Sequence, residues 1–204
     1  MDYEILVNRE NPISDKFKIE KLVSVGKHFS LARLVYTDQD VLLEKNTAIF
    51  LKKLLDDANN IDKNIVVVPN SGYRTIEYQV KVMNYYIKLE GLEKAKKRVA
   101  EPGTSEHHTG LAIDLIFFYK GKLLKNLNQA LRTISFIYNN AHKYGFILRY
   151  PKDKEAITGY PYEPWHFRYV GIKLATYLYE NSMTLEEYYL NKRFSNNLGG
   201  KKIG

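Results

Sequence analysis

Apolar residues recur at helical spacing in several parts of the chain. In residues 47–58 and 127–142 they fall three and four positions apart, which is the spacing of one face of an α-helix. Residues 75–89, with Thr75 as a suitable N-cap, and the helix-forming residues 91–100 predict a further helical stretch. We therefore expect helices in all three regions.

Short apolar runs rich in β-branched and aromatic residues lie between and after these helices. They predict four strands, at residues 65–68, 110–119, 146–150 and 165–170. A helix is expected from about Ile172, and Thr184 with Glu187 forms a capping box at the start of a last helix. Because the connections are too varied for a strict alternation of strand and helix, the pattern predicts an α+β domain with a small antiparallel sheet packed by helices.

The composition is typical of a globular protein with one core. Hydrophobic residues make up 45% of the 204 positions, and the chain is too short for two comfortable domains. We expect a single domain over residues 1–194 and a flexible tail at residues 195–204, which are rich in Asn, Gly and Lys. We also expect a monomer.

Basic residues exceed acidic ones, with 31 Lys and Arg against 23 Asp and Glu. The excess is dispersed and accompanies no nucleic-acid-reading motif, so we expect no nucleic-acid partner. No apolar run approaches the ~18 residues of a transmembrane helix, and the first residues lack the basic and apolar regions of a signal peptide. The sequence as it stands predicts a cytoplasmic protein without a transmembrane segment. A location outside the cytoplasm or at the cell wall would require a leader before this chain.

Two short segments concentrate the side chains that could carry chemistry. They are residues 105–114 and 162–169, which hold three of the five histidines. A catalytic zinc ion takes three ligands from His, Asp or Glu and leaves a fourth position for water. Since the chain has no cysteine, the ligands of any metal must be nitrogen or oxygen atoms. His107, Asp114 and His166 would supply that set.

Strand geometry restricts how these residues can meet. Residues seven apart on an unbroken strand point to opposite faces, so His107 and Asp114 converge only if the chain turns near Gly110. Pro164 offers the corresponding break between Glu163 and His166. Glu163 could then act as general base on a water activated by zinc, and peptide hydrolysis is the natural reaction class. A histidine that only donates an orienting hydrogen bond to an aspartate is the alternative that spacing leaves open.

Three motifs in one order give these residues a family context. Ser71-Gly72-Tyr73-Arg74-Thr75 is followed by Ser-x-His-x-x-Gly-x-Ala-x-Asp at residues 105–114 and by Glu-x-x-His at residues 163–166. Over about residues 65–189 the chain resembles the VanY-type D-alanyl-D-alanine carboxypeptidases, a zinc peptidase family that includes VanXY-like dipeptidase/carboxypeptidases and L,D-carboxypeptidases. The resemblance implies a Hedgehog/D,D-peptidase-like fold.

The resemblance also implies roles for individual residues. His107, Asp114 and His166 would bind one Zn²⁺ ion together with a water molecule. Glu163 would be the catalytic acid and base, and Arg74 would stabilise the oxyanion or bind the terminal carboxylate of the substrate. The side chains expected in the substrate pocket are Ser71, Tyr73, Gln79, Ser105 and Trp165.

One position departs from the family pattern, which leads us to expect Gln where this chain has His108. An ionisable ring beside a metal ligand could tune the pH dependence of the site, or it could point away as a surface polar group. His108 is not counted among the expected ligands.

The activity implied by the resemblance is a D,D-carboxypeptidase. It would remove the C-terminal D-Ala from peptidoglycan stem pentapeptides or D-Ala-terminated precursors, and it could also cleave the D-Ala-D-Ala dipeptide. Such an activity would link the protein to cell-wall remodelling or glycopeptide resistance. Two alternatives stay open: an L,D-carboxypeptidase acting on tetrapeptide stems, and a non-catalytic wall-binding module on the same fold.

Overall fold

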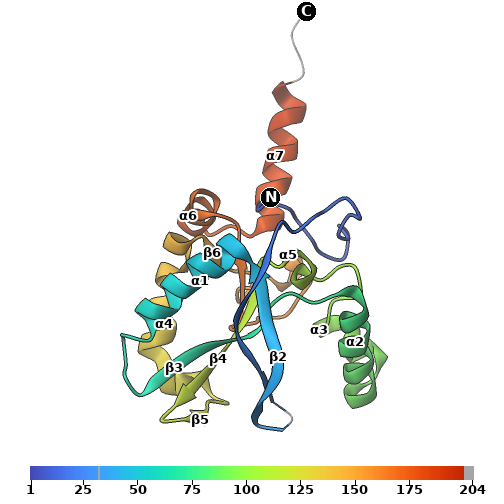
Figure 1. Cartoon of the computed structure of the whole chain (residues 1–204). Coiled ribbons are helices and arrows are strands. Elements are labelled where there is room, and N and C mark those ends of the chain that lie inside the picture. The colour runs from blue at the N-terminus through green and yellow to red at the C-terminus, as the bar shows by residue number, and fades with distance from the viewer. Residues whose placement is uncertain (32, 200–204) are drawn as a thin grey trace, which may run out of the picture.

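The central sheet is antiparallel, and its strands follow the order β3–β4–β7–β6, with β5 paired to the C-terminal end of β4. The computed structural model describes residues 1–31 and 33–199 of the chain (Figure 1). The strands of this sheet are β3 (Ile65–Ser71), β4 (Ala112–Tyr119), β5 (Lys122–Leu123), β6 (Phe146–Leu148) and β7 (His166–Tyr169). The predicted α+β class with a small antiparallel sheet is confirmed.

One face of this sheet is apolar, and the other carries polar side chains. In β4, Ile113 and Leu115 belong to the main core, and the alternation of the strand turns Asp114 to the opposite face. In β7, Phe167 belongs to the same core and His166 alternates with it. The residues expected to carry chemistry are therefore gathered on the polar face.

Helices surround the sheet (Figure 1). Their bounds are α1 Lys45–Ala58, α2 Ile76–Glu90, α3 Leu92–Arg98, α4 Leu131–Asn140, α5 Glu155–Thr158, α6 Ile172–Glu180 and α7 Leu185–Gly199, with 3₁₀ turns η1 Glu106–Thr109, η2 Leu127–Ala130 and η3 Ala141–Tyr144. α1 and α4 bury Leu51 and Ile137 in the main core. α2 and α3 form a pair with a small core of its own, which includes Met83 and Ala95. No described helix is long and apolar enough to cross a membrane.

A long hairpin of β1 (Leu22–Ser30) and β2 (Val35–Glu44) precedes α1 and has no counterpart among the predicted strands. Two register shifts interrupt its ladder, one of them next to Gly26, and few of its side chains are buried. A strand that is bulged and exposed lacks the regular apolar alternation by which strands are recognised in a sequence.

The predicted helices agree with the structure, with small differences at their ends. The capping box is confirmed, because Glu187 Oε2 accepts from the Thr184 N–H at 2.7 Å and Thr184 Oγ1 accepts from the Glu187 N–H at 3.2 Å. The helix that begins there continues to Gly199, so the predicted tail starts in the structure as helical turns, and residues 200–204 lie outside the described residues. Extending a helix costs much less than nucleating one, which explains how it runs into a stretch of weak helix formers.

Candidate active site

Three neighbouring strands bring Ser71, Asp114 and His166 into one row. Ser71 is paired with Asp114 in the β3–β4 register, and Asp114 is paired with His166 in the β4–β7 register. Directly paired residues on adjacent strands point to the same face and touch. The row therefore joins side chains that lie far apart in the sequence, and it occupies the polar face of the sheet.

His107, Asp114 and His166 converge at this row. Asp114 Oδ2 lies 3.4 Å from His107 Nε2, and Asp114 Oδ1 lies 2.9 Å from His166 Nδ1. One ligand atom from each of the three residues can be chosen so that all lie within 4.8 Å of one another. The sequence predicted this cluster, and the structure brings all three members together.

The approach of His107 to Asp114 depends on the short 3₁₀ turn η1 and on Gly110. His107 lies in η1, and Gly110 ends that turn in the left-handed conformation, with φ 69° and ψ 9°. The strand proper begins only at Ala112, two residues after the predicted start. The turn removes the strand parity that would otherwise point His107 and Asp114 to opposite faces.

A close backbone contact orients the His107 ring. His107 Nδ1 lies 2.6 Å from the Gly72 carbonyl oxygen, to which it donates, so the lone pair of Nε2 faces Asp114. A Cβ atom on residue 72 would lie 2.2 Å from the Leu42 carbonyl oxygen, so only glycine lets β2 pack this closely against the turn that carries the carbonyl. Two imidazole nitrogens and a carboxylate, with one ring already oriented by its second nitrogen, fit the donor set of a catalytic zinc ion.

Burial and charge shift the pKa values of His107 and His166 in opposite directions. Burial and the positive charge of Arg74 lower the pKa of His107 to about 4. Burial also acts to lower the pKa of His166, but contacts with Asp114 and Glu106 outweigh it and raise this pKa to about 9. At neutral pH His107 is therefore neutral, and His166 is protonated on both ring nitrogens. A cation that binds at His166 Nδ1 would have to displace the proton there.

Glu163 stands beside the cluster as the second carboxylate. Its Oε2 lies 3.8 Å from His166 Nδ1, and the two residues bracket a turn in which the His166 N–H donates to the Glu163 carbonyl at 3.2 Å. This turn contains Pro164 and supplies the break that the sequence required. Burial, with the charge of Asp114 as a smaller contribution, raises the pKa of Glu163 to about 7. A carboxylate with such a pKa can both accept and return a proton near neutral pH.

Arg74 reaches the cluster from the turn after β3. Its Nη2 donates to Asp114 Oδ2 at 3.0 Å and to Ser71 Oγ at 2.7 Å, and its Nη1 donates to Gln79 Oε1 at 3.3 Å. Gln79 is fully buried and is itself fixed by a bond from its Nε2 to the Ala100 carbonyl at 2.9 Å. Ser71 and Gln79 thus position the guanidinium of Arg74. The sequence predicted both residues in the substrate pocket but did not predict these contacts with Arg74.

The other three predicted pocket residues, Ser105, Trp165 and Tyr73, have different surroundings. Ser105 is buried, and its Oγ accepts from the His107 N–H at 3.3 Å, which is N-cap geometry. Trp165 lies in the turn before His166 and is 38% exposed, so it is not a core anchor. Tyr73 lines a cavity of about 470 Å³ together with Arg74, His108 and part of the N-terminal segment.

His108 is neither a surface residue nor a ligand. Its Nδ1 lies 2.8 Å from the Arg74 carbonyl, and its Nε2 accepts from the Gly103 N–H at 3.0 Å. The two bonds require the neutral tautomer with the proton on Nδ1, and burial lowers the pKa of His108. The ring therefore ties the backbone of Arg74 to the loop before η1.

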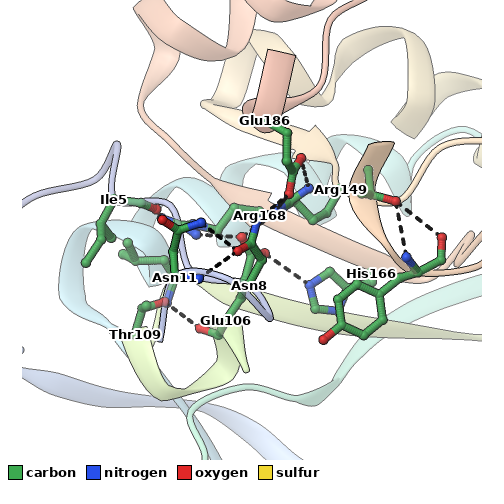
Figure 2. Close-up of polar contacts among 12 residues, drawn as sticks. Ile5, Asn8, Asn11, Glu106, Thr109, Arg149, His166, Arg168 and Glu186 are labelled. Atoms are coloured by element: carbon green, nitrogen blue, oxygen red, sulfur yellow. Dashed lines mark hydrogen bonds and ion pairs between the residues drawn. The ribbon is translucent and has the colours of Figure 1, made fainter. Parts of the chain in front are cut away.

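Sequence reasoning missed a group of buried charges behind His166. Glu106, Arg149 and Arg168 are each at most 2% exposed, and Glu106 Oε1 accepts from both arginines at 2.8 Å (Figure 2). The available signal was the presence of Arg149 and Arg168 inside the predicted strands 146–150 and 165–170. A charge in such a place needs a partner of opposite sign.

Comparison with known proteins agrees with this geometry. The family model for VanY, D-alanyl-D-alanine carboxypeptidase, matches residues 40–172. The chain is 39% identical over 184 residues to the putative carboxypeptidase YodJ of Bacillus subtilis, which covers 90% of this chain and 66% of that protein. It is 37% identical over 192 residues to the bifunctional D-Ala-D-Ala dipeptidase and carboxypeptidase VanXYC of Enterococcus gallinarum, covering 90% of this chain and 92% of that one.

Solved structures show the same fold. The LdcB LD-carboxypeptidase superimposes with a TM-score of 0.73 at 37% identity, covering 90% of this chain and 84% of that chain. A variant of the vancomycin-resistance D,D-pentapeptidase VanY in complex with Zn(II) superimposes with a TM-score of 0.73 at 33% identity, covering 93% of this chain and 99% of that one. At this identity and coverage the likeness extends to the whole domain.

Proposed function

The chain belongs to the VanY family of D-alanyl-D-alanine carboxypeptidases, and from this premise we propose that it is a zinc-dependent D,D-carboxypeptidase. It would remove the C-terminal D-Ala from peptidoglycan stem pentapeptides or their precursors. The observation that carries the proposal is the convergence of His107, Asp114 and His166 within 4.8 Å, with Glu163 beside them. The match to the Bacillus subtilis relative spans 66% of that protein's length. That the whole protein has this activity is therefore also proposed.

The three ligands would be His107 Nε2, an oxygen of Asp114 and His166 Nδ1. When bound, zinc supplies the Lewis acidity that polarises a peptide carbonyl and makes water nucleophilic at neutral pH. Glu163 would take a proton from the attacking water and deliver it to the leaving amine of D-Ala. Its burial keeps the carboxyl group close to the pKa that both transfers need.

Arg74 would handle the negative charge of the substrate or of the tetrahedral intermediate. Its guanidinium is held by Ser71, Gln79 and Asp114, so it is oriented before the substrate arrives. A pre-oriented cation stabilises developing charge without a reorganisation cost during the reaction. Both roles of Arg74, at the oxyanion and at the terminal carboxylate, are compatible with this position.

An L,D-carboxypeptidase is the second candidate, and a specific observation favours it. The solved LdcB LD-carboxypeptidase is as similar in fold to this chain as the VanY D,D-pentapeptidase, with a TM-score of 0.73 for each. Another solved structure, VanYB in complex with D-alanine-D-alanine, superimposes with a TM-score of 0.72 and supports the D,D assignment. The metal ligands and Glu163 would serve either reaction, so the substrate has to decide.

A digest of defined stem peptides tests the proposal. The zinc-loaded protein is incubated separately with a pentapeptide ending in D-Ala-D-Ala and with the corresponding tetrapeptide, and the products are identified by mass. Loss of one residue from the pentapeptide supports the D,D assignment, and loss from the tetrapeptide alone supports the L,D alternative. Glu163→Gln is the control, since it should keep zinc and lose about 10²- to 10⁴-fold in turnover. If neither peptide is shortened, the proposed activity is refuted.

A further inference from the structure

We propose that Glu106 is a positioning residue for the proposed metal site: its carboxylate accepts from His166 Nε2–H and so directs His166 Nδ1 to the metal. The inference rests on the proposed function, because it concerns how one of the three ligands is held. Glu106 lies behind His166 as seen from Asp114, and no motif of the family context assigned it a task.

The two oxygens of the Glu106 carboxylate have different surroundings (Figure 2). Oε1 accepts from Arg149 Nε and from Arg168 Nη1, both at 2.8 Å. Oε2 lies 3.5 Å from His166 Nε2, and within the described chain neither of these two atoms has a hydrogen-bond partner. A carboxylate that served only as counterion to the arginines would offer both oxygens to them. Here one oxygen is left for the histidine.

This contact would decide which nitrogen of His166 binds the metal. A ring whose Nε2 carries the proton has its lone pair on Nδ1, and Nδ1 is the atom 2.9 Å from Asp114 Oδ1. His107 shows the same device with the nitrogens exchanged, since its Nδ1 donates to the Gly72 carbonyl and its Nε2 faces Asp114. Each ligand ring would thus be fixed by one acceptor outside the cluster.

The two arginines that bind Glu106 are in turn bound by parts of the chain that lie outside residues 40–172. Arg149 is bound by both carboxylate oxygens of Glu186 in α7, at 2.6 and 2.9 Å, and Asn8 Nδ2 donates to the same carboxylate at 3.1 Å. Arg168 Nη2 donates to the Ile5 carbonyl at 2.7 Å. The N-terminal segment and the last helix therefore brace the residue that orients His166 (Figure 2).

A pair of isosteric variants separates the proposed task from charge balance in the network. In Glu106→Gln the amide oxygen has to serve the two arginines, which leaves the NH₂ group facing His166 Nε2 and favours the wrong tautomer. Glu186→Gln removes a carboxylate from the same Arg149 without touching His166. We expect Glu106→Gln to weaken zinc binding about 10- to 100-fold, and Glu186→Gln, which acts on His166 only through Arg149 and Glu106, to weaken it by less than about 3-fold, in competition titrations against a chromogenic chelator.

Each outcome decides the matter. If Glu106→Gln is folded and binds zinc as tightly as the unmodified protein, the positioning role is refuted while the proposed function stands. If the unmodified protein binds no zinc, both are refuted. If Glu106→Gln does not fold, ¹⁵N NMR of the histidines in the zinc-loaded protein replaces it: a proton on Nε2 and metal on Nδ1 of His166 support the role, and the reverse tautomer overturns it.

Discussion

His166 Nδ1 lies 2.9 Å from Asp114 Oδ1, although 52 positions separate the two residues in the chain. Their contact follows from the sheet, because Asp114 and His166 are direct partners in the register of β4 and β7. A shift of that register by one residue would turn one of the two side chains into the apolar core. The forces that hold the core in register, such as burial of Ile113 and Phe167, therefore also hold Asp114 and His166 together.

The first prediction concerns the effect of the metal on stability. A ligand that binds only the folded state stabilises it by about 2.7 kcal/mol when its concentration is 100 times Kd, which for a chain of this size raises the melting temperature by about 5–10 °C. We expect the melting temperature to be higher by this amount in zinc than in EDTA, and we expect excess zinc added to the EDTA-treated protein to restore it. Calorimetry measures it, with His107→Ala as the control that should not respond. An equal response of that variant would place the bound zinc elsewhere.

The second prediction uses the raised pKa of Glu163, which moves from 4.5 to about 7 on folding. Between these two values the unfolded chain ionises Glu163 and the folded metal-free chain does not, so stability falls as pH rises through this window and stays low above it. Glu163→Gln has no such loss. We expect the variant in EDTA to match the original at pH 4 and to exceed it by up to about 3 kcal/mol at pH 8.

Urea denaturation at both pH values checks this second prediction. The gain at pH 8 should appear in the same variant that has lost turnover, as expected when an active-site carboxylate is kept buried for function. A variant that is less stable than the original protein at pH 8 would show that burial does not penalise the Glu163 charge.

The third prediction tests the close approach at Gly72. A Cβ on this residue would meet the Leu42 carbonyl oxygen at 2.2 Å, so Gly72→Ala must displace either the turn or β2. Because Gly72 also accepts from His107 Nδ1, we expect a loss of more than about 2 kcal/mol in stability together with weaker zinc binding.

Gly91→Ala is the matched control for this third prediction. Gly91 has φ 85° and ψ 160°, which a residue with a Cβ adopts only with strain, but open space around its Cα, so Gly91→Ala should lose about 1–3 kcal/mol from backbone strain alone and keep its zinc affinity. Urea denaturation and zinc titration of both variants make the comparison. If the two substitutions had the same effect, crowding at Gly72 would not be what limits this position.

That His107, Asp114, His166, Glu163 and Arg74 form one site could be predicted from the sequence, because each is part of a short motif whose order is characteristic of the family. The strands that carry them were also predictable, since Ile113, Leu115 and Phe167 form regular apolar runs. The spacing could not predict how His107 and Asp114, which would point to opposite faces of an unbroken strand, come to lie on the same side. The η1 turn and the left-handed Gly110 do so, and both depend on backbone conformation rather than on side-chain pattern.

The contacts among the buried charges and the β1–β2 hairpin could not be predicted from the sequence, for other reasons. Glu106 meets Arg149 and Arg168 across 43 and 62 positions, and no local pattern encodes partners at that separation. The same is true of Ser71 and Gln79, whose bonds to Arg74 depend on how the turn after β3 folds back. The hairpin β1–β2 is exposed and bulged, so its alternation is too irregular to predict strands.

The last prediction concerns His108, which stands where the resemblance to the family leads us to expect Gln. Its ring bridges the Arg74 carbonyl and the Gly103 N–H, and a Gln side chain also offers one donor and one acceptor. We therefore expect His108→Gln to retain most activity. His108→Leu leaves both backbone groups unpaired, which should cost about 1–3 kcal/mol in stability and, by letting Arg74 shift, up to about 10²-fold in kcat/KM. Steady-state kinetics on the stem peptide and urea denaturation measure the two effects. Since the ring serves as an acceptor, its role does not require a charge; a His108→Gln variant as impaired as His108→Leu would instead show that the imidazole itself is needed.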